Sequence, residues 1–172
     1  MPGVQSFTDL KCWQEARLWS KMIFQQTKTQ PFARDRRLVE QINDSSESVM
    51  SNIAEGFGRG TQAELILFLG YALGSLDETR SHLVAAYDRE FIPKPMYETL
   101  FRQGTAIRKM TVGLITSMIR PGGGVKFFRR QKSWSDEVWE LYERVTGKER
   151  PELYRTHSEA NGRPPRNDTP PS

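Results

Sequence analysis

Few side chains in this 172-residue chain combine the types and the spacing that catalysis or metal binding requires. The chain has two histidines, His82 and His157, and a single cysteine, Cys12. A di-iron site in a helical bundle needs Glu-x-x-His pairs on two helices. Here Glu78 and His82 are four residues apart, and no second pair exists. A lone cysteine also excludes an intrachain disulfide and a cysteine-based metal cage. We therefore expect no metal and no cofactor.

A second constellation consists of small polar and acidic residues near the middle of the chain. Ser48, Asn52 and Glu55 are spaced four and three apart and share one helix face. Ser75 and Glu78 are three residues apart and share one face of the following helix. The set is either a catalytic site or a hydrogen-bonded layer that holds two helices in register. The layer is favoured, because polar groups left unpaired inside a bundle cost about 1–3 kcal/mol each.

Two glycines, Gly56 and Gly58, follow this cluster directly. We expect them to supply positive φ angles where the chain reverses direction. A phosphate-binding loop of the Gly-x-x-x-x-Gly-Lys type is missing from the sequence. With no nucleophile–base pair and no such loop, the sequence predicts that the protein is not an enzyme.

Four long helical patterns must position these side chains. Apolar residues recur at helical spacing over residues 9–28, 35–58, 61–88 and 95–120. Asp35 and Thr61 have the types and places of N-caps. Connections of about five to eight residues make sequential helices antiparallel neighbours. The sequence thus predicts an all-α fold, an antiparallel up-and-down four-helix bundle with a short C-terminal helical extension.

Three segments are expected along the chain. Residues 1–120 form the bundle. Residues 121–157 form an extension that begins with a triglycine hinge, continues with a basic and aromatic stretch and ends with a short helix. Residues 158–172 are rich in Pro, Asn and Arg and hold no large apolar side chain, so they are expected to be disordered.

The third helix is apolar on every side over Leu65–Leu73, which predicts that more than one of its faces is covered. A second subunit would cover the outer face, and Gly70 and Gly74 would let its backbone approach closely. The alternative cover is the chain's own C-terminal segment, through Trp134 and Trp139. The predicted oligomer interface comprises Leu65, Ile66, Leu69, Gly70, Leu73 and Gly74.

The chain is moderately basic, with a formal net charge of +4 and a pI of about 9.3. Its basic residues form clusters that a ring of identical subunits would multiply into a belt for RNA or single-stranded nucleic acid. The candidate contacts are Arg36, Arg37, Arg59, Lys126, Arg129, Arg130 and Lys132. Phe127 and Phe128 are placed to stack on unpaired bases. The alternative is that these charges are merely solvated and that the two rings dock on the bundle.

No membrane span is expected, because the longest uncharged apolar stretch, Leu65–Leu76, has twelve residues and a span needs about 20. The N-terminus lacks the basic and apolar regions of a secretory signal. We therefore expect a soluble, cytoplasmic protein.

The stretch from the second to the third helix resembles a known family, the four-helix-bundle proteins encoded in intervening sequences of bacterial 23S rRNA genes. The residues that carry the resemblance are Ser48, the run Ser51-Asn52-Ile53-Ala54-Glu55-Gly56, Gly58, Arg59, Phe68, Ala72, Gly74 and Ser75. The opening residues Phe7, Leu10, Trp13 and Ala16 are similar too. The resemblance covers about residues 7–119 and implies a small bundle assembled as a homopentamer.

The architecture is also similar to that of the accessory variability-determinant proteins of diversity-generating retroelements, which bind a reverse transcriptase and nucleic acid. Together these features predict a non-enzymatic, oligomeric nucleic-acid-binding accessory protein, with RNA the favoured ligand. The alternative is a scaffold or adaptor ring that recruits a protein partner, such as a reverse transcriptase, through its surface or its C-terminal helix.

Overall fold

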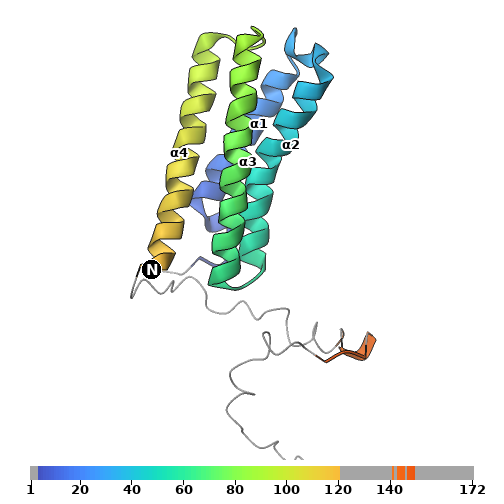
Figure 1. The fold of residues 1–172 in the computed structure, drawn as a ribbon, viewed down its shortest axis with the longest axis vertical. Helices are drawn as coiled ribbons and strands as arrows, with labels where there is room; N and C mark the ends of the chain where they lie inside the picture. Colours follow the sequence, from blue (N-terminus) through green and yellow to red (C-terminus); the bar gives the residue numbers. More distant parts are fainter. Residues whose placement is uncertain (1–3, 121–140, 142, 146, 150–172) are drawn as a thin grey trace, which may run out of the picture. The chain divides into compact units, whose positions relative to one another are not determined.

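The computed structural model describes residues 4–120, 141, 143–145 and 147–149. Its helices are α1 (Lys11–Thr27), α2 (Arg36–Gly58), α3 (Gln62–Asp88) and α4 (Lys94–Ile119), with short 3₁₀ turns at Phe7–Asp9 and Phe32–Arg34. Successive helices run in opposite directions (Figure 1), and the described part of the chain contains no strand. This confirms the all-α, antiparallel four-helix bundle. None of its helices is long and apolar enough to cross a membrane.

The chain divides into two units, Met1–Gln131 and Lys132–Ser172, and the four long helices belong to the first. In the second unit, Leu141 and residues 143–145 are helical, which agrees with the predicted C-terminal helix. The predicted boundaries of the extension and the tail, and its tryptophans Trp134 and Trp139, lie outside the described residues.

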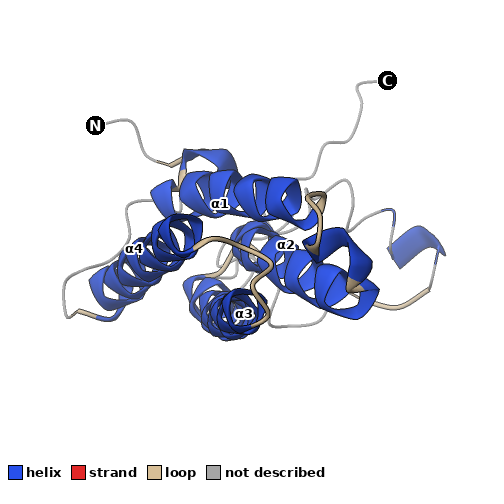
Figure 2. Ribbon diagram, turned by 90° about the horizontal axis from the view of Figure 1, so that it is seen from above, coloured by secondary structure: helices blue, strands red, loops and turns tan. Residues whose placement is uncertain are grey.

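Seen from above (Figure 2), α1 and α3 lie opposite each other, with α2 and α4 on either side. α1 packs against α2 and α4, and α3 packs against the same two helices on the opposite side. The contact between α2 and α3 is the most extensive of the four. These two helices are joined by a turn of only three residues, Arg59–Thr61, and such a short connection makes them antiparallel neighbours.

The predicted N-caps are confirmed. The Asp35 carboxylate accepts from the backbone N–H of Leu38 at 3.1 Å and starts α2. The Thr61 hydroxyl accepts from the N–H of Glu64 at 3.2 Å and starts α3. Each bond satisfies an N–H group that the helix itself leaves without a partner.

The core is built from one buried stripe on each helix. Along α3 the buried positions alternate in steps of four and three, as in a heptad pattern; they are Leu65, Leu69, Ala72, Leu76, Thr79, Leu83 and Ala86. Trp19 of α1 is fully buried, and its indole Nε1 donates to the carbonyl oxygen of Leu100 in α4 at 2.8 Å. This bond fixes the level at which α1 and α4 meet.

Candidate functional site

Among the described residues, the side chains best suited to catalysis are Cys12 and the pair Glu78 and His82, whereas His157 lies outside these residues. Cys12 is 3% exposed, and burial raises the pKa of its thiol, so the thiol stays neutral and is a poor nucleophile. Across the residues that the structure describes, no three His, Cys, Asp or Glu side chains lie close enough to hold a metal ion. His82 is 3.7 Å from Glu78 on the same helix, with its Nε2 facing the carboxylate.

The predicted polar residues of α2 do not bond to α3, so the prediction of a polar layer shared by the two helices is wrong. The amide Nδ2 of Asn52 donates to the backbone oxygen of Ser48 at 2.8 Å, within its own helix. Glu55 is exposed, and its carboxylate accepts a hydrogen bond from the guanidinium of Arg59 at 2.6 Å. Each of the three residues lies one position before a buried one, and one residue turns a helix by about 100°. The face that these residues share therefore points beside the core rather than into it.

The predicted layer residues on α3 also interact within their own helix. Ser75 takes part through its backbone oxygen, which lies 2.8 Å from the hydroxyl of Thr79 in the same helix. Glu78 is exposed, and its carboxylate faces His82. These residues support their own helices and do not hold α2 and α3 together.

A different hydroxyl layer connects the helices through the core. Thr79 Oγ1 of α3 lies 2.9 Å from Ser45 Oγ of α2, and both residues are buried. On the other side of α2, Ser46 Oγ is 3.2 Å from Ser20 Oγ of α1. A hydrogen bond between buried hydroxyls on two helices resists sliding of one helix past the other, because a shift leaves the hydroxyls unpaired. A signal existed in the sequence, since Ser45 and Thr79 occupy heptad positions otherwise filled by apolar residues.

Removal of the Thr79 hydroxyl is expected to destabilise the bundle. Thr79→Val keeps the shape of the side chain but leaves Ser45 without its cross-helix partner, so the free energy of unfolding should fall by about 1–3 kcal/mol. Thr116→Val is the matched control, because Thr116 is exposed and bonds only to the Val112 carbonyl of its own helix. Equal urea midpoints for the two variants would contradict the role of the layer.

The two motif glycines also have other roles than predicted. Gly56 and Gly58 lie inside α2, and the positive-φ glycines of the described chain are Gly60 and Gly147. A Cβ on Gly56 would lie 2.6 Å from the Cβ of Phe68 in α3. Gly56 therefore permits the close approach of α2 and α3, whereas a Cβ on Gly58 would meet nothing within 4 Å.

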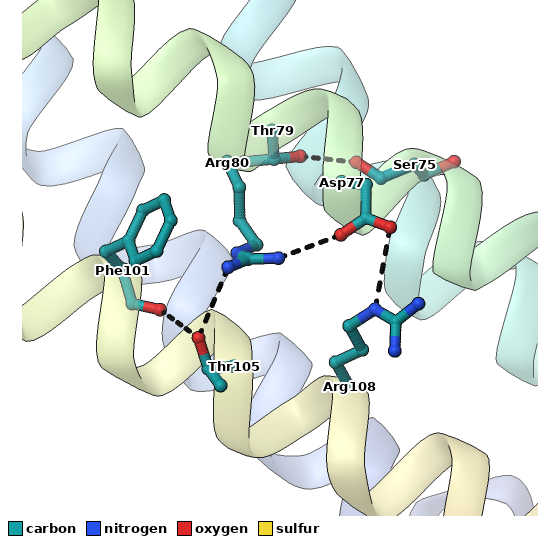
Figure 3. Close-up of polar contacts among 7 residues, drawn as sticks. All are labelled: Ser75, Asp77, Thr79, Arg80, Phe101, Thr105 and Arg108. Atoms are coloured by element: carbon teal, nitrogen blue, oxygen red, sulfur yellow. Dashed lines mark hydrogen bonds and ion pairs between the residues drawn. The ribbon is translucent and has the colours of Figure 1, made fainter.

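A charged cluster joins the outer sides of α3 and α4 (Figure 3). The guanidinium of Arg80 donates to Asp77 at 3.0 Å and to the Thr105 hydroxyl at 3.5 Å, and it lies 4.3 Å from the ring centroid of Phe101. Arg108 approaches the other oxygen of Asp77 at 3.5 Å. One carboxylate thus offsets two guanidinium groups across the seam. We assign this cluster to helix pairing, because its groups are already engaged with one another.

The predicted nucleic-acid contacts fall into three groups. Arg36 and Arg37 are exposed in the first turn of α2, and neither forms an ion pair with another described residue. Arg59 is offset by Glu55 and by Glu64, at 2.6 and 4.0 Å. The remaining candidates lie outside the described residues: Lys126, Arg129, Arg130 and Lys132.

Sequence reasoning missed a ridge of exposed side chains on α1. Arg17, Lys21, Phe24 and Lys28 are spaced four, three and four apart, so they follow one face of the helix out to its C-cap. The ring of Phe24 is 48% exposed, and the ammonium of Lys28 lies 4.1 Å from its centroid. The spacing alone predicts such a ridge, but the side of the bundle that it faces depends on how α1 packs.

The predicted oligomer interface on α3 divides between the core and the surface. Leu65 and Leu69 are buried in the chain's own core, at 2% and 0% exposure, so they cannot contact a second subunit directly. Ile66 and Leu73 are half-buried. Gly70 and Gly74 are exposed, with open space where a Cβ would stand.

Two large apolar side chains of the stretch Leu65–Leu73 that are not among the predicted interface residues lie beside these glycines. Leu67 is 50% exposed and Tyr71 is 52% exposed. The outer face of α3 therefore remains apolar in the isolated chain. A subunit contact on this face stays a prediction.

These features define the chain as a small up-and-down four-helix-bundle protein in which polar groups fix the helix register. The model of the 23S rRNA-intervening sequence protein family matches residues 8–113. The chain belongs to this family, which confirms the resemblance carried by the stretch around Asn52. No match is found among curated proteins.

A solved structure supports the same fold. It is a protein of unknown function from the S23 ribosomal protein family of Bacteroides thetaiotaomicron VPI-5482. Its sequence is 22% identical to this one, the alignment covers 61% of this chain and 95% of that chain, and the TM-score is 0.56. At this identity the likeness bears on the fold alone.

Proposed function

We propose that this protein is a non-enzymatic, oligomeric accessory protein that binds RNA or single-stranded nucleic acid with little sequence preference. The observation that carries the proposal is an imbalance of exposed charge. Residues 4–120 hold 15 basic and 13 acidic side chains. Ten of the basic ones and six of the acidic ones are exposed and form no ion pair with another described residue. Cations that face solvent are available to displace counterions from phosphates.

These ten cations lie along α1 and α4 and at the two ends of the connection between α1 and α2. They are Lys11, Arg17, Lys21, Lys28, Arg34, Arg36, Arg37, Arg102, Lys109 and Arg120. Repetition of one modest patch by the symmetry of a ring raises the local potential above what +4 per chain provides. The exposed apolar face of α3, with Leu67 and Tyr71, supports assembly of identical subunits.

A second candidate function is a scaffold ring that recruits a protein partner, such as a reverse transcriptase. The exposed α3 face favours it when that face contacts the partner instead of a second subunit, because an apolar surface suits a protein better than a polyanion. The two functions differ in one measurable property. Binding to nucleic acid weakens steeply with salt, whereas docking on an apolar face does not.

A salt titration of a fluorescently labelled single-stranded RNA tests the proposal. We expect log affinity to fall linearly with log salt concentration, with each phosphate contact contributing about 0.7 to the slope. The double change Arg36→Ala, Arg37→Ala should flatten the slope by about 1.4 if both cations touch phosphate. Replacement of Lys126, Arg129, Arg130 and Lys132 with alanine tests the second basic cluster in the same way.

Lys94→Ala is the matched control for the titration, because Lys94 is exposed but already lies 3.8 Å from Glu98. Its slope should equal that of the unchanged protein. If the full chain binds no RNA at low salt, the nucleic-acid proposal is wrong and the scaffold function replaces it.

A further inference from the structure

A groove runs between α1 and α2 on the outside of the bundle, and neither the family resemblance nor the predicted site includes it. The groove is open to solvent, has a volume of about 350 Å³ and is lined by Arg17, Ser20, Lys21, Phe24, Asn43 and Glu47. This volume is at the lower end of the range of small-ligand sites, so the groove accommodates a single nucleotide rather than a duplex. None of the lining residues belongs to the apolar core.

The α1 wall of the groove supplies positive charge and an aromatic ring. Arg17 and Lys21 are one turn apart, about 6 Å along the helix axis, and both are exposed. Phe24 follows on the same face, and Lys28 adds a third cation above its ring. Alternation of cations with an exposed aromatic side chain is the pattern of single-stranded nucleic-acid sites, where phosphates meet the cations and bases stack on the ring.

The α2 wall supplies acceptors. Asn43 and Glu47 are four residues apart and so lie on one face of α2. The amide of Asn43 donates to Thr27 Oγ1 at 3.2 Å, which holds this side chain against α1. Glu47 is exposed, and no cation of the described chain lies within ion-pair distance of its carboxylate, although two of them line the same groove.

This carboxylate decides what kind of ligand suits the groove. A track for phosphates alone would be weakened by a negative charge in its wall. A carboxylate accepts two hydrogen bonds side by side and donates none. Among the four RNA bases, guanine alone presents two adjacent donors, N1–H and the N2 amino group, on its Watson–Crick edge. Such edges are free to bind protein in single-stranded RNA.

We propose that the α1–α2 groove binds one unstacked guanine of a single-stranded RNA. The base stacks on the face of the Phe24 ring opposite Lys28, the Glu47 carboxylate accepts from guanine N1–H and N2–H, and Arg17 and Lys21 contact the flanking phosphates. This inference rests on the proposed function and goes beyond it, because it gives a largely sequence-tolerant protein one base-selective position.

Fluorescence anisotropy with three labelled oligoadenylates tests the inference on the full chain. One carries a central guanosine, one carries inosine at that position and one carries adenosine throughout. We expect the guanosine oligomer to bind about tenfold more tightly than the adenosine oligomer. Inosine lacks the N2 amino group, so the affinity for the inosine oligomer should lie between the other two affinities.

Two variants separate the base contact from the stacking contact. Glu47→Ala should abolish the preference for guanosine while leaving, or slightly raising, the affinity for the adenosine oligomer, since a negative charge is lost. Phe24→Leu should weaken all three oligomers by about fivefold or more, because stacking is lost whatever the base. Glu40→Ala and Leu18→Ala are the matched controls, as both residues are exposed on the same helices and do not line the groove. Neither control should change the preference or the affinity.

Three results would overturn the inference. Equal affinity for all three oligomers, with Glu47→Ala indistinguishable from the unchanged protein, removes the guanine site and leaves the proposed function standing. A complete lack of RNA binding at low salt removes both. If Phe24→Leu changes the mass of the assembly in light scattering but not its RNA affinity, the groove is covered by a second copy of the chain instead. Unchanged far-ultraviolet circular dichroism of each variant shows that the bundle still folds.

Discussion

Trp19→Ala is expected to lower the free energy of unfolding by about 3–5 kcal/mol. The indole is fully buried between α1 and α4, and its removal leaves a cavity that a close-packed bundle fills only in part. The substitution also removes the donor to the Leu100 carbonyl, which lies 2.8 Å from Nε1. Urea unfolding followed by circular dichroism measures the loss.

Leu18→Ala is the control for this substitution, because Leu18 is the neighbouring residue on the same helix and is 50% exposed. Its cost should be within about 1 kcal/mol, as for most surface changes. Comparable losses for the two variants would mean that Trp19 is not at the centre of the α1–α4 contact.

Gly56→Ala is expected to destabilise the bundle by about 1–3 kcal/mol, although alanine is the better helix former by about 1 kcal/mol. The new Cβ would lie 2.6 Å from the Cβ of Phe68 and 3.3 Å from the Cα of Leu65. These atoms are at or next to the backbone of α3, so relief requires α2 and α3 to move apart rather than a side chain to rotate. Thermal and urea unfolding of the variant measure this cost.

Gly58→Ala is the matched control, two residues along the same helix. Its Cβ would meet nothing within 4 Å, and it should leave stability unchanged or raise it by up to about 1 kcal/mol. Opposite signs for the two substitutions would confirm that Gly56 is needed for helix approach and Gly58 is not. A stabilising effect of Gly56→Ala would contradict the close contact.

The helices themselves were predictable because their signals are local. Apolar spacing and the caps at Asp35 and Thr61 act within a few residues of where they stand. These signals do not depend on how the helices meet. The predicted bundle therefore agrees with the structure in fold class, in helix order and in nearly every helix end.

The polar contacts between helices were less predictable, because a helix face is narrow. Asn52 and Glu55 are each one residue from a buried position, and that offset turns them out of the α2–α3 contact. Ser45 and Thr79, which do make the contact, look in the sequence like ordinary interruptions of an apolar stripe. Their heptad positions indicate burial, but only the packing of α2 on α3 shows that these two hydroxyls meet.

Surfaces shared by two helices were the least accessible to sequence reasoning. The groove that unites Lys21 and Phe24 of α1 with Glu47 of α2 exists because the two helices lie side by side. Residues more than twenty positions apart carry no local signal of this proximity. The same holds for the outer face of α3, where Leu67 and Tyr71 rather than Leu65 and Leu69 reach the surface.

Under the proposed function, an assembly of these bundles binds single-stranded RNA. Sedimentation velocity with fluorescence detection of labelled RNA tests it most directly, because one boundary reports both binding and the mass of the binding species. At low salt we predict that the RNA sediments with an assembly several times heavier than the 19.8 kDa chain, and that high salt returns it to its free rate. RNA that sediments at its free rate at low salt, in the presence of excess folded protein, would contradict the account.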